Sequence, residues 1–256
     1  MKMFSTALVT TFGLFAVSVS AAELLALGED GMLYHINSES LTVTSTRPVD
    51  SQAALRGIDV RPASGEVYAL VGGDQLYTLD PATGSLQSKS TLNQTLPGSG
   101  QAVVDFNPVA DRLRLLAPDG TNFRVNVDTG EVTLDGKVAY AADGPYAGQA
   151  PQVLAGAYTN SYPGTESTSL YNVDLATDHL MLQNPPNDGK QLAVGMIAEG
   201  LKSVAFDIAS DRSASNTAWL LTGNTLHRID LKSAKPTTLG KVKGLPETMI
   251  DLAVMP

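Results

Sequence analysis

Five copies of one short segment constrain the fold of this chain more than any other feature. Each copy has an aromatic residue or a histidine in its second position, an aliphatic residue in its fourth, and Asp or Asn in its fifth. The copies are Leu33–Asn37, Leu76–Asp80, Asn122–Asn126, Leu170–Asp174 and Leu226–Asp230. The second and fourth side chains of a strand point to the same face, so each copy predicts a β-strand with one buried stripe. The copies recur every 43 to 56 residues, which leaves room for four strands and their loops.

Turn and strand signals around the copies complete a four-stranded unit. The terminal Asp or Asn opens a turn that ends in Gly, as in Asp80–Gly84 and Asn126–Gly130. A second type of strand leads into the copy through a Gly-, Asp- or Asn-containing hairpin tip. Its members are Leu24–Leu27, Val67–Val71, Leu113–Leu116 and Trp219–Thr222. Further upstream, a third type of strand carries a central Asp in Gly57–Pro62, Val103–Pro108 and Val204–Ile208.

The last strand of the chain has the same pattern as this third type. The first repeat lacks such a strand, and Met249–Val254 can fill the gap. That pairing would close a ring without open sheet edges. The sequence therefore predicts an all-β fold, a five-bladed β-propeller with four antiparallel strands per blade, closed by the C-terminal strand. An open sandwich or a solenoid is the alternative, and the displaced strand argues against both.

The first residues of the chain predict a signal peptide. Lys2 precedes an apolar run from Phe4 to Val19 and the small residues Ser20-Ala21-Ala22, so cleavage after Ala21 or Ala22 fits the pattern. The run is shorter than a membrane span requires, which argues against an uncleaved anchor. We therefore predict a signal peptide over residues 1–22, one propeller domain over residues 23–256, and a periplasmic or secreted protein that does not span a membrane after cleavage.

Composition narrows the possible partners. The chain has no cysteine, which excludes disulfides, thiolate metal sites and cysteine nucleophiles. Its formal net charge is −9, without a cluster of Lys and Arg, and this argues against nucleic acid. An acidic chain is better suited to bind a small molecule, a sugar, a peptide, a protein or a cation than a nucleic acid. We expect the protein to be a monomer.

Four runs resemble one bacterial family across nearly the whole mature chain. They are Gly57–Pro62, Asp105–Arg114, Ala157–Ser161 and Gln183–Asn187. In these runs the sequence resembles the family of domain of unknown function 4394. The resemblance implies an exported, propeller-like domain and brings no established activity or catalytic residue.

The fourth repeat departs from the rule of the others. It has a long hairpin tip after Tyr158 and no Asp in its inner strand, and long loops flank it at 141–151 and 183–189. Function in repeat proteins often lies in loops that break the repeat. Aromatic faces and planar amides suit a sugar or a peptide. The candidate ligand-binding residues are Tyr158, Asn160, Tyr162, Asn184 and Asn187, with Arg112 and Arg124 nearby. The alternative is that these residues only shape loops.

The central acids of the third type of strand are candidates for a metal site. Asp59, Asp105, Asp207 and Asp251 could form a carboxylate collar around the channel that binds Ca²⁺. A residue repeated in four blades more often serves each blade, so we favour a structural role in which each Asp ties its strand to neighbouring N–H groups. The three histidines lie far apart in sequence and carry no catalytic motif.

Two functions remain open from the sequence. The favoured one is an exported, non-enzymatic binding or interaction propeller, because no acid, base and nucleophile occur together in a recognisable motif. The alternative is a propeller hydrolase or lyase, metal-dependent or carbohydrate-directed, that uses the inner-strand carboxylates. No catalytic residue is assigned.

Overall fold

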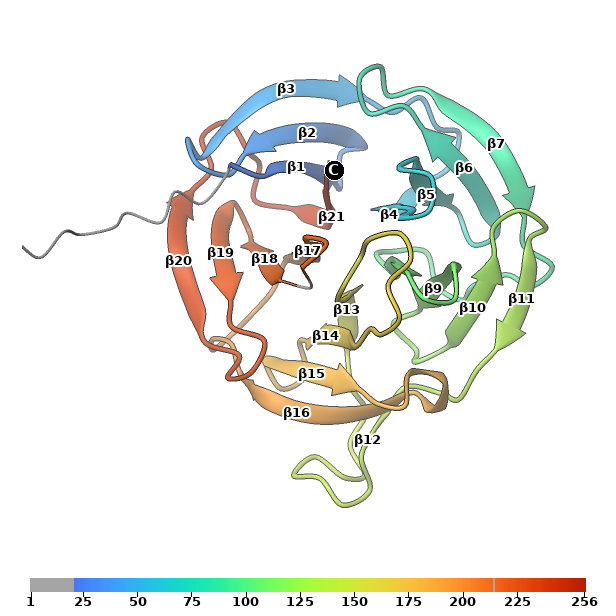
Figure 1. Cartoon of the computed structure of the whole chain (residues 1–256), viewed down its shortest axis with the longest axis vertical. Helices are drawn as coiled ribbons and strands as arrows, with labels where there is room; N and C mark the ends of the chain where they lie inside the picture. Colours follow the sequence, from blue (N-terminus) through green and yellow to red (C-terminus); the bar gives the residue numbers. More distant parts are fainter. Residues whose placement is uncertain (1–20, 214) are drawn as a thin grey trace, which may run out of the picture.

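The fold consists of five antiparallel sheets arranged around one axis. It is known from a computed structural model that describes residues 21–213 and 215–256. Figure 1 shows the sheets as blades of a ring, viewed along the axis. This arrangement confirms the predicted all-β, five-bladed propeller. The predicted signal peptide falls almost entirely outside the described residues.

Each blade has an inner, a second, a third and an outer strand. Blade 1 comprises β21 (Met249–Val254), β1 (Glu23–Gly28), β2 (Met32–Asn37) and β3 (Thr42–Pro48). Blade 2 comprises β4 (Leu55–Val60), β5 (Val67–Val71), β6 (Gln75–Leu79) and β7 (Leu86–Thr91). Blade 3 comprises β8 (Val103–Asn107), β9 (Arg112–Leu116), β10 (Asn122–Asn126) and β11 (Glu131–Leu134).

Blades 4 and 5 complete the ring. Blade 4 comprises β13 (Val153–Tyr158), β14 (Leu170–Asp174), β15 (His179–Gln183) and β16 (Lys190–Met196), with β12 (Ala139–Tyr140) added parallel to β16. A short 3₁₀ helix, η1 (Pro186–Asp188), lies between β15 and β16. Blade 5 comprises β17 (Val204–Ser210), β18 (Asn216–Thr222), β19 (Thr225–Ile229) and β20 (Pro236–Lys241).

The C-terminal strand closes the ring, as the sequence predicts. Strand β21 pairs antiparallel with β1, with Leu24 opposite Val254 and Ala26 opposite Leu252. Each inner strand contacts the inner strands of both neighbouring blades, in the order β21, β4, β8, β13, β17 and back to β21. The first and last strands of the domain are thus held in one sheet.

Blade 4 differs from the prediction in its register. The copy Leu170–Asp174 is a second strand that pairs directly with β13, whereas the other four copies are third strands. The third strand of blade 4 is β15, which lacks the terminal Asp or Asn. The two positions could not be separated by pattern, because Leu170–Asp174 carries the aromatic, aliphatic and Asp residues of a third strand. The turn at 174–178 therefore joins the second and third strands, and residues 184–189 form the hairpin that leads to the outer strand.

The hydrophobic core lies between the blades rather than along the axis. One cluster joins Tyr68 and Leu70 of blade 2 to Phe106 and Phe123 of blade 3, and similar clusters fill the other junctions. Among the described residues, no helix is long and apolar enough to cross a membrane.

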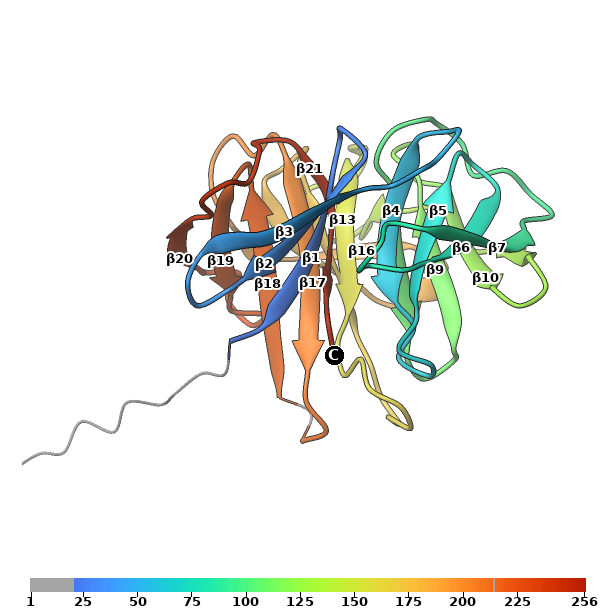
Figure 2. The same ribbon diagram turned by 90° about the horizontal axis from the view of Figure 1, so that it is seen from above.

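The two faces of the ring differ. All inner strands end on the face turned to the viewer in Figure 1, which we call the mouth face. In Figure 2 this face lies at the bottom, and the hairpins after β13 and β17 project furthest from it, on either side of the C-terminus. The connections that enter the inner strands lie on the opposite face.

Candidate functional site at the axial mouth

The four inner-strand aspartates join neighbouring blades. Asp59 of blade 2 accepts a hydrogen bond from the Phe106 N–H of blade 3 at 2.7 Å. The same tie recurs from Asp105 to the Tyr158 N–H, from Asp207 to the Val254 N–H, and from Asp251 to the Ile58 N–H. Asp59, Asp207 and Asp251 also accept the N–H of the residue that follows them. Seven of the eight carboxylate oxygens thus have backbone partners, and Oδ2 of Asp105 has none.

The fifth junction uses amides in place of a carboxylate. Blade 4 has no inner Asp, and its contact with blade 5 is a reciprocal pair between Asn160 and Asn216. The Asn160 N–H donates to Oδ1 of Asn216 at 2.8 Å, and Nδ2 of Asn216 donates to Oδ1 of Asn160 at 2.9 Å. Asn160 therefore links blade 4 to blade 5 at the junction that has no inner-strand carboxylate.

Three of the carboxylates converge on the axis. One oxygen from each of Asp59, Asp105 and Asp207 lies within 4.8 Å of the other two. In the described part of the chain no Lys, Arg or His forms an ion pair with them or with Asp251. Their negative charge is therefore not balanced by a basic side chain.

Burial changes the acidity of this group. Loss of water around the carboxylates is the main cause, and it raises the pKa of Asp207 to about 6. The same burial, together with the charge of nearby Asp207, raises the pKa values of Asp59, Asp105 and Asp251 well above the ordinary range. The collar consequently holds protons more tightly than exposed aspartates do.

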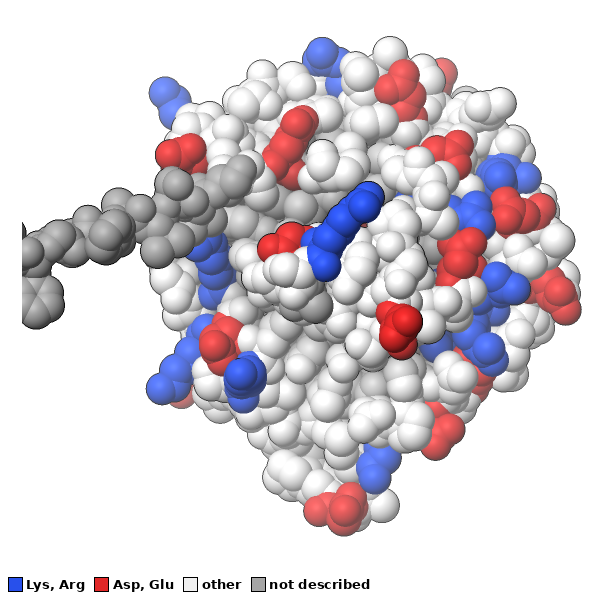
Figure 3. All heavy atoms as spheres, in the orientation of Figure 1, with Lys and Arg blue, Asp and Glu red and all other residues white. Residues whose placement is uncertain are grey.

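A cavity of about 390 Å³ opens from this collar onto the mouth face. Asp59 and Asp207 line it, and Tyr162 and Pro163 of the long blade 4 hairpin form part of its wall. Figure 3 shows that most charged side chains on this face lie toward the rim, while a Lys or Arg side chain and Asp or Glu side chains also lie near the axis. The mouth thus combines buried carboxylates with an aromatic wall.

A second polar network lies between blades 3 and 4, centred on the buried Arg114. Its guanidinium donates to Asp135 at 2.7 Å, to Oδ1 of Asn187 at 2.8 Å, to Oδ1 of Asn122 at 2.7 Å, and to the Tyr158 hydroxyl at 3.1 Å. Only 1% of the Arg114 side chain and 7% of the Asp135 side chain are exposed. The network fixes the position of blade 4 against blade 3.

The seven predicted ligand-binding residues do not form one site. Tyr158 and Asn187 bind Arg114, and Arg124 joins the same network through Asp135. Arg112 donates to carbonyls of its own hairpin, and Asn184 is exposed beside Pro185. Asn160 is at the junction of blades 4 and 5. Tyr162 is the member that lines the axial cavity.

Replacing Tyr158 with phenylalanine tests the role of its hydroxyl. The change leaves Nε of the buried Arg114 without its partner, so we expect the free energy of unfolding to fall by about 1–2 kcal/mol. Urea denaturation measures this difference. Tyr77→Phe is the matched control, expected within about 0.5 kcal/mol of the parent because the Tyr77 hydroxyl makes no hydrogen bond to any residue that the structure describes. Equal stability of the two variants would contradict the assignment.

The sequence runs that resemble the family meet at these junctions. Asp59 and Arg61 of the first run bind Phe106 and Asp111 of the second, and the Arg61–Asp111 ion pair is 2.6 Å long. Arg114 of the second run contacts Tyr158 of the third and Asn187 of the fourth. The runs therefore build the contacts between blades 2, 3 and 4.

Sequence reasoning missed Arg114 and Asp135 as a buried pair. Arg114 lies between Leu113 and Leu115 in a strand predicted to be buried, and a charge at such a position signals a buried partner. Its partner could not be found from one sequence, because Asp135 follows a different strand. Arg212, which lines the axial mouth, carries no such signal.

Comparison with known proteins places the chain in a class and a family. The fold is a five-bladed β-propeller. Residues 40–253 match the family described as Domain of unknown function (DUF4394), so the chain belongs to that family. This confirms the resemblance found in the four runs. None of the curated proteins is significantly similar to the sequence.

Solved structures resemble the chain at low sequence identity. A protein of unknown function from Bacteroides caccae is 14% identical with a TM-score of 0.47, over 90% of this chain and 77% of that one. A structural genomics protein of unknown function from Bacteroides thetaiotaomicron VPI-5482 is 15% identical with a TM-score of 0.54, over 91% and 64%. The computationally designed Ika8 protein is 12% identical with a TM-score of 0.38, over 91% and 63%. This chain thus spans less than two thirds of the second and third proteins, and the likeness concerns the fold alone.

Proposed function

We propose that this protein is an exported binding propeller that takes a positively charged group at its axial mouth. The observation that carries the proposal is the collar of Asp59, Asp105 and Asp207, which has no basic partner and lies under an open cavity. The side chains that line the cavity include three carboxylates, Asp59, Asp207 and Asp211, against one guanidinium, Arg212, a formal balance of −2. A cation would relieve the repulsion among the carboxylates.

A metal ion could supply the positive charge, and the spacing of the collar oxygens fits a metal ion. Two oxygens bound to the same Ca²⁺ at about 2.4 Å can lie at most about 4.8 Å apart. The oxygens of Asp59, Asp105 and Asp207 meet this limit, and within the described part of the chain the backbone bond to Asp105 goes to its Oδ1 and not to its Oδ2. Three protein oxygens leave several coordination positions, so water or a ligand would supply the rest.

An organic ammonium or guanidinium group is the other source. A lysine or arginine side chain of a peptide could reach Asp59 and Asp207 from the cavity, beside the ring of Tyr162. An aromatic face next to carboxylates is a favourable environment for such a group. Both sources share the same chemistry, a positive charge recognised by buried carboxylates, and they can be separated by experiment.

Binding has more support here than hydrolysis or elimination. Seven carboxylate oxygens of the collar already accept backbone N–H bonds, which restrains their use as acids or bases in a reaction. The signal-peptide pattern supports export to the periplasm or beyond. We propose a monomer, because each blade already packs against two neighbours in a closed ring.

Tyr162→Ala separates the two sources of charge. The Tyr162 hydroxyl has no hydrogen bond in the described structure, so we expect little change in stability. Loss of a cation–π contact of about 1 kcal/mol should weaken binding of argininamide about fivefold and leave Ca²⁺ binding unchanged. Calorimetric titration with each probe measures both effects, and Glu166→Ala on the same hairpin is the control. Absence of binding of both probes to the parent protein would overturn the proposed function.

A further inference from the structure

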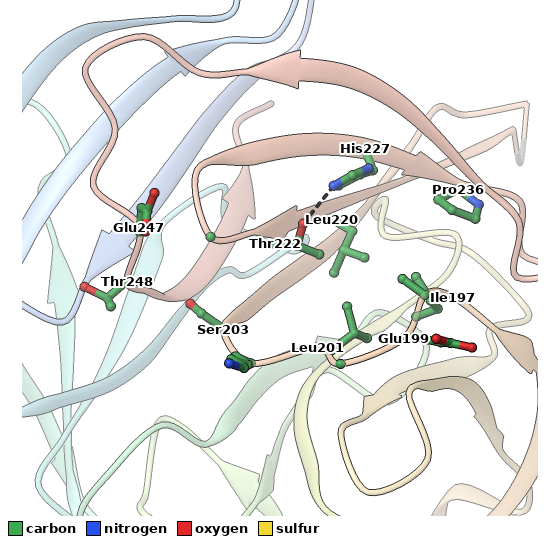
Figure 4. A pocket seen from close by; sticks show the side chains of 14 residues that line it. Ile197, Glu199, Leu201, Ser203, Leu220, Thr222, His227, Pro236, Glu247 and Thr248 are labelled. Atoms are coloured by element: carbon green, nitrogen blue, oxygen red, sulfur yellow. Dashed lines mark hydrogen bonds between the residues drawn. The ribbon is translucent and has the colours of Figure 1, made fainter.

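A larger pocket lies on the opposite face, away from the axial mouth. It has a volume of about 470 Å³ and lies between blade 5 and the connection that enters it, residues 197–203. Figure 4 shows Leu201 and Leu220 pointing toward each other across it, with Ile197 and Pro236 nearby and His227 on the wall. This volume and mostly apolar lining are typical of small-molecule sites. The pocket shares no residue with the axial cavity.

The pocket lies beside a position that blades 1 to 3 fill with a tyrosine or phenylalanine ring. Tyr34, Tyr77 and Phe123 sit in the second position of the repeat on the third strands of blades 1, 2 and 3. Each pairs with a residue of the second strand and packs into the cluster shared with the preceding blade. These three rings therefore close the gaps beside them.

In blade 5 this position holds His227. It pairs with Leu220 of the second strand, the same register that the rings have in blades 1 to 3. Its two ring nitrogens are 2.8 Å from the Thr222 hydroxyl and 3.0 Å from the Thr238 hydroxyl. The imidazole is smaller than a phenol or phenyl ring and is held by hydroxyls at both nitrogens. It does not belong to the apolar cluster between blades 4 and 5.

Blade 5 thus differs from blades 1 to 3, because an open pocket lies beside the position where those blades have a packed tyrosine or phenylalanine ring. Binding residues in repeat proteins must break the symmetry in this way, since a feature shared by all blades serves the blades themselves. Burial also lowers the pKa of His227, which favours the uncharged form of its ring. A neutral imidazole does not repel a ligand that carries a positive charge.

We infer that this pocket binds a small molecule through an aromatic ring, which packs beside the small imidazole of His227. The apolar side chains of Leu201, Leu220 and Ile197 would contact the faces and edges of the ring. Two exposed carboxylates, Glu199 and Glu247, and one exposed amine, Lys202, line the opening. Their balance favours a ligand with a protonated alkylamine attached to its ring over one with a carboxylate.

His227→Trp tests this inference by filling the pocket. The indole extends into space that the imidazole leaves open, so we expect at least tenfold weaker binding of tyramine. Calorimetric titration of tyramine into the parent and the variant measures the change. Leu201→Trp fills the same pocket from the entering connection and should also weaken tyramine binding at least tenfold. It keeps the test decisive if His227→Trp folds poorly.

Comparison ligands and a control variant complete the test. We expect 4-hydroxyphenylacetate and 2-cyclohexylethylamine to bind several-fold more weakly than tyramine to the parent protein. Thr237→Ala, on the outer strand and outside the pocket, should leave tyramine binding unchanged. The inference is overturned if tyramine does not bind, if it binds both filled variants as well as the parent, or if the saturated ring binds equally well.

Discussion

Replacing Arg114 with methionine is expected to lower the free energy of unfolding by about 3 kcal/mol. Removing one partner of a buried ion pair typically costs about 3–5 kcal/mol, because the other charge stays buried. Here Asp135 keeps its bonds from Arg124 at 3.0 and 3.1 Å, which places the cost at the lower end. The change also leaves the Tyr158 hydroxyl and the Asn187 amide without their shared donor. Denaturation in urea measures the loss.

Arg112 provides a matched control on the same strand. It lies two residues away, carries the same charge, and donates only to carbonyls of its own exposed hairpin. Arg112→Met should stay within about 0.5 kcal/mol of the parent protein. If both arginines prove equally important or equally dispensable, the account of Arg114 as the tie between blades 3 and 4 is wrong.

The second large effect is a loss of stability as the pH rises. Burial raises the pKa of Asp207 from 3.8 in its usual state to about 6 in the folded protein. The folded state therefore binds this proton more tightly than the unfolded state. Its contribution is fully present below the unfolded pKa and is lost as the pH rises through about 6. A difference of about two pKa units corresponds to about 3 kcal/mol.

Other carboxylates set the acid side of this profile. Asp59, Asp105 and Asp251 shift in the same direction as Asp207 and steepen the fall above the acid range. Asp111 and Asp128 have pKa values below the ordinary range because of hydrogen bonds from Arg61 and Lys89, so their contribution is lost as the pH falls. In the absence of added cations, the free energy of unfolding should therefore be highest at about pH 4 and fall as the pH rises above it.

Asp207→Asn isolates the contribution of the collar. The amide keeps an oxygen acceptor and cannot ionise, so the fall in stability between about pH 4 and pH 7 should become shallower. Asp230→Asn, in an exposed turn, should leave that part of the profile unchanged. Urea denaturation at a series of pH values gives both curves. A parent protein that gains stability from pH 5 to pH 7.5 would show that the collar is not strained by its charge.

The architecture could be predicted from the sequence because the repeat period and the strand types indicated the same fold. The period of the repeated segment gave the blades, and the shared strand type of Met249–Val254 gave the closure. Blade 4 was misaligned because Leu170–Asp174 carries the pattern of a third strand in the position of a second. Second strands are buried more completely than third strands, as β5 and β6 show, but the residue pattern of one segment does not reveal which strand it pairs with. The long hairpin after Tyr158 removed the length cue that would have separated them.

The site was predictable only in part. The inner aspartates could be found because they recur, and their convergence on the axis follows from the ring. Tyr158 and Asn187 look like ligand-binding residues in sequence, yet both are hydrogen-bonded to Arg114 between blades. That contact depends on segments more than forty residues apart, which no local pattern reveals. The pocket beside His227 was also missed, because the sequence shows a substituted ring and not the space that remains.

Cation binding at the axial mouth can be tested by calorimetric titration of the purified protein with CaCl₂ and with argininamide. Each titration is made at pH 7.5 and at pH 4.5. At pH 7.5, above the pKa of about 6 of Asp207, we predict saturable binding of one of the two probes. At pH 4.5 Asp207 is protonated, and the same probe should bind at least tenfold more weakly. Asp59→Asn combined with Asp207→Asn should abolish the binding at pH 7.5. Absence of binding of both probes at pH 7.5, or binding that is unchanged in the double variant, would contradict a cation-binding axial mouth.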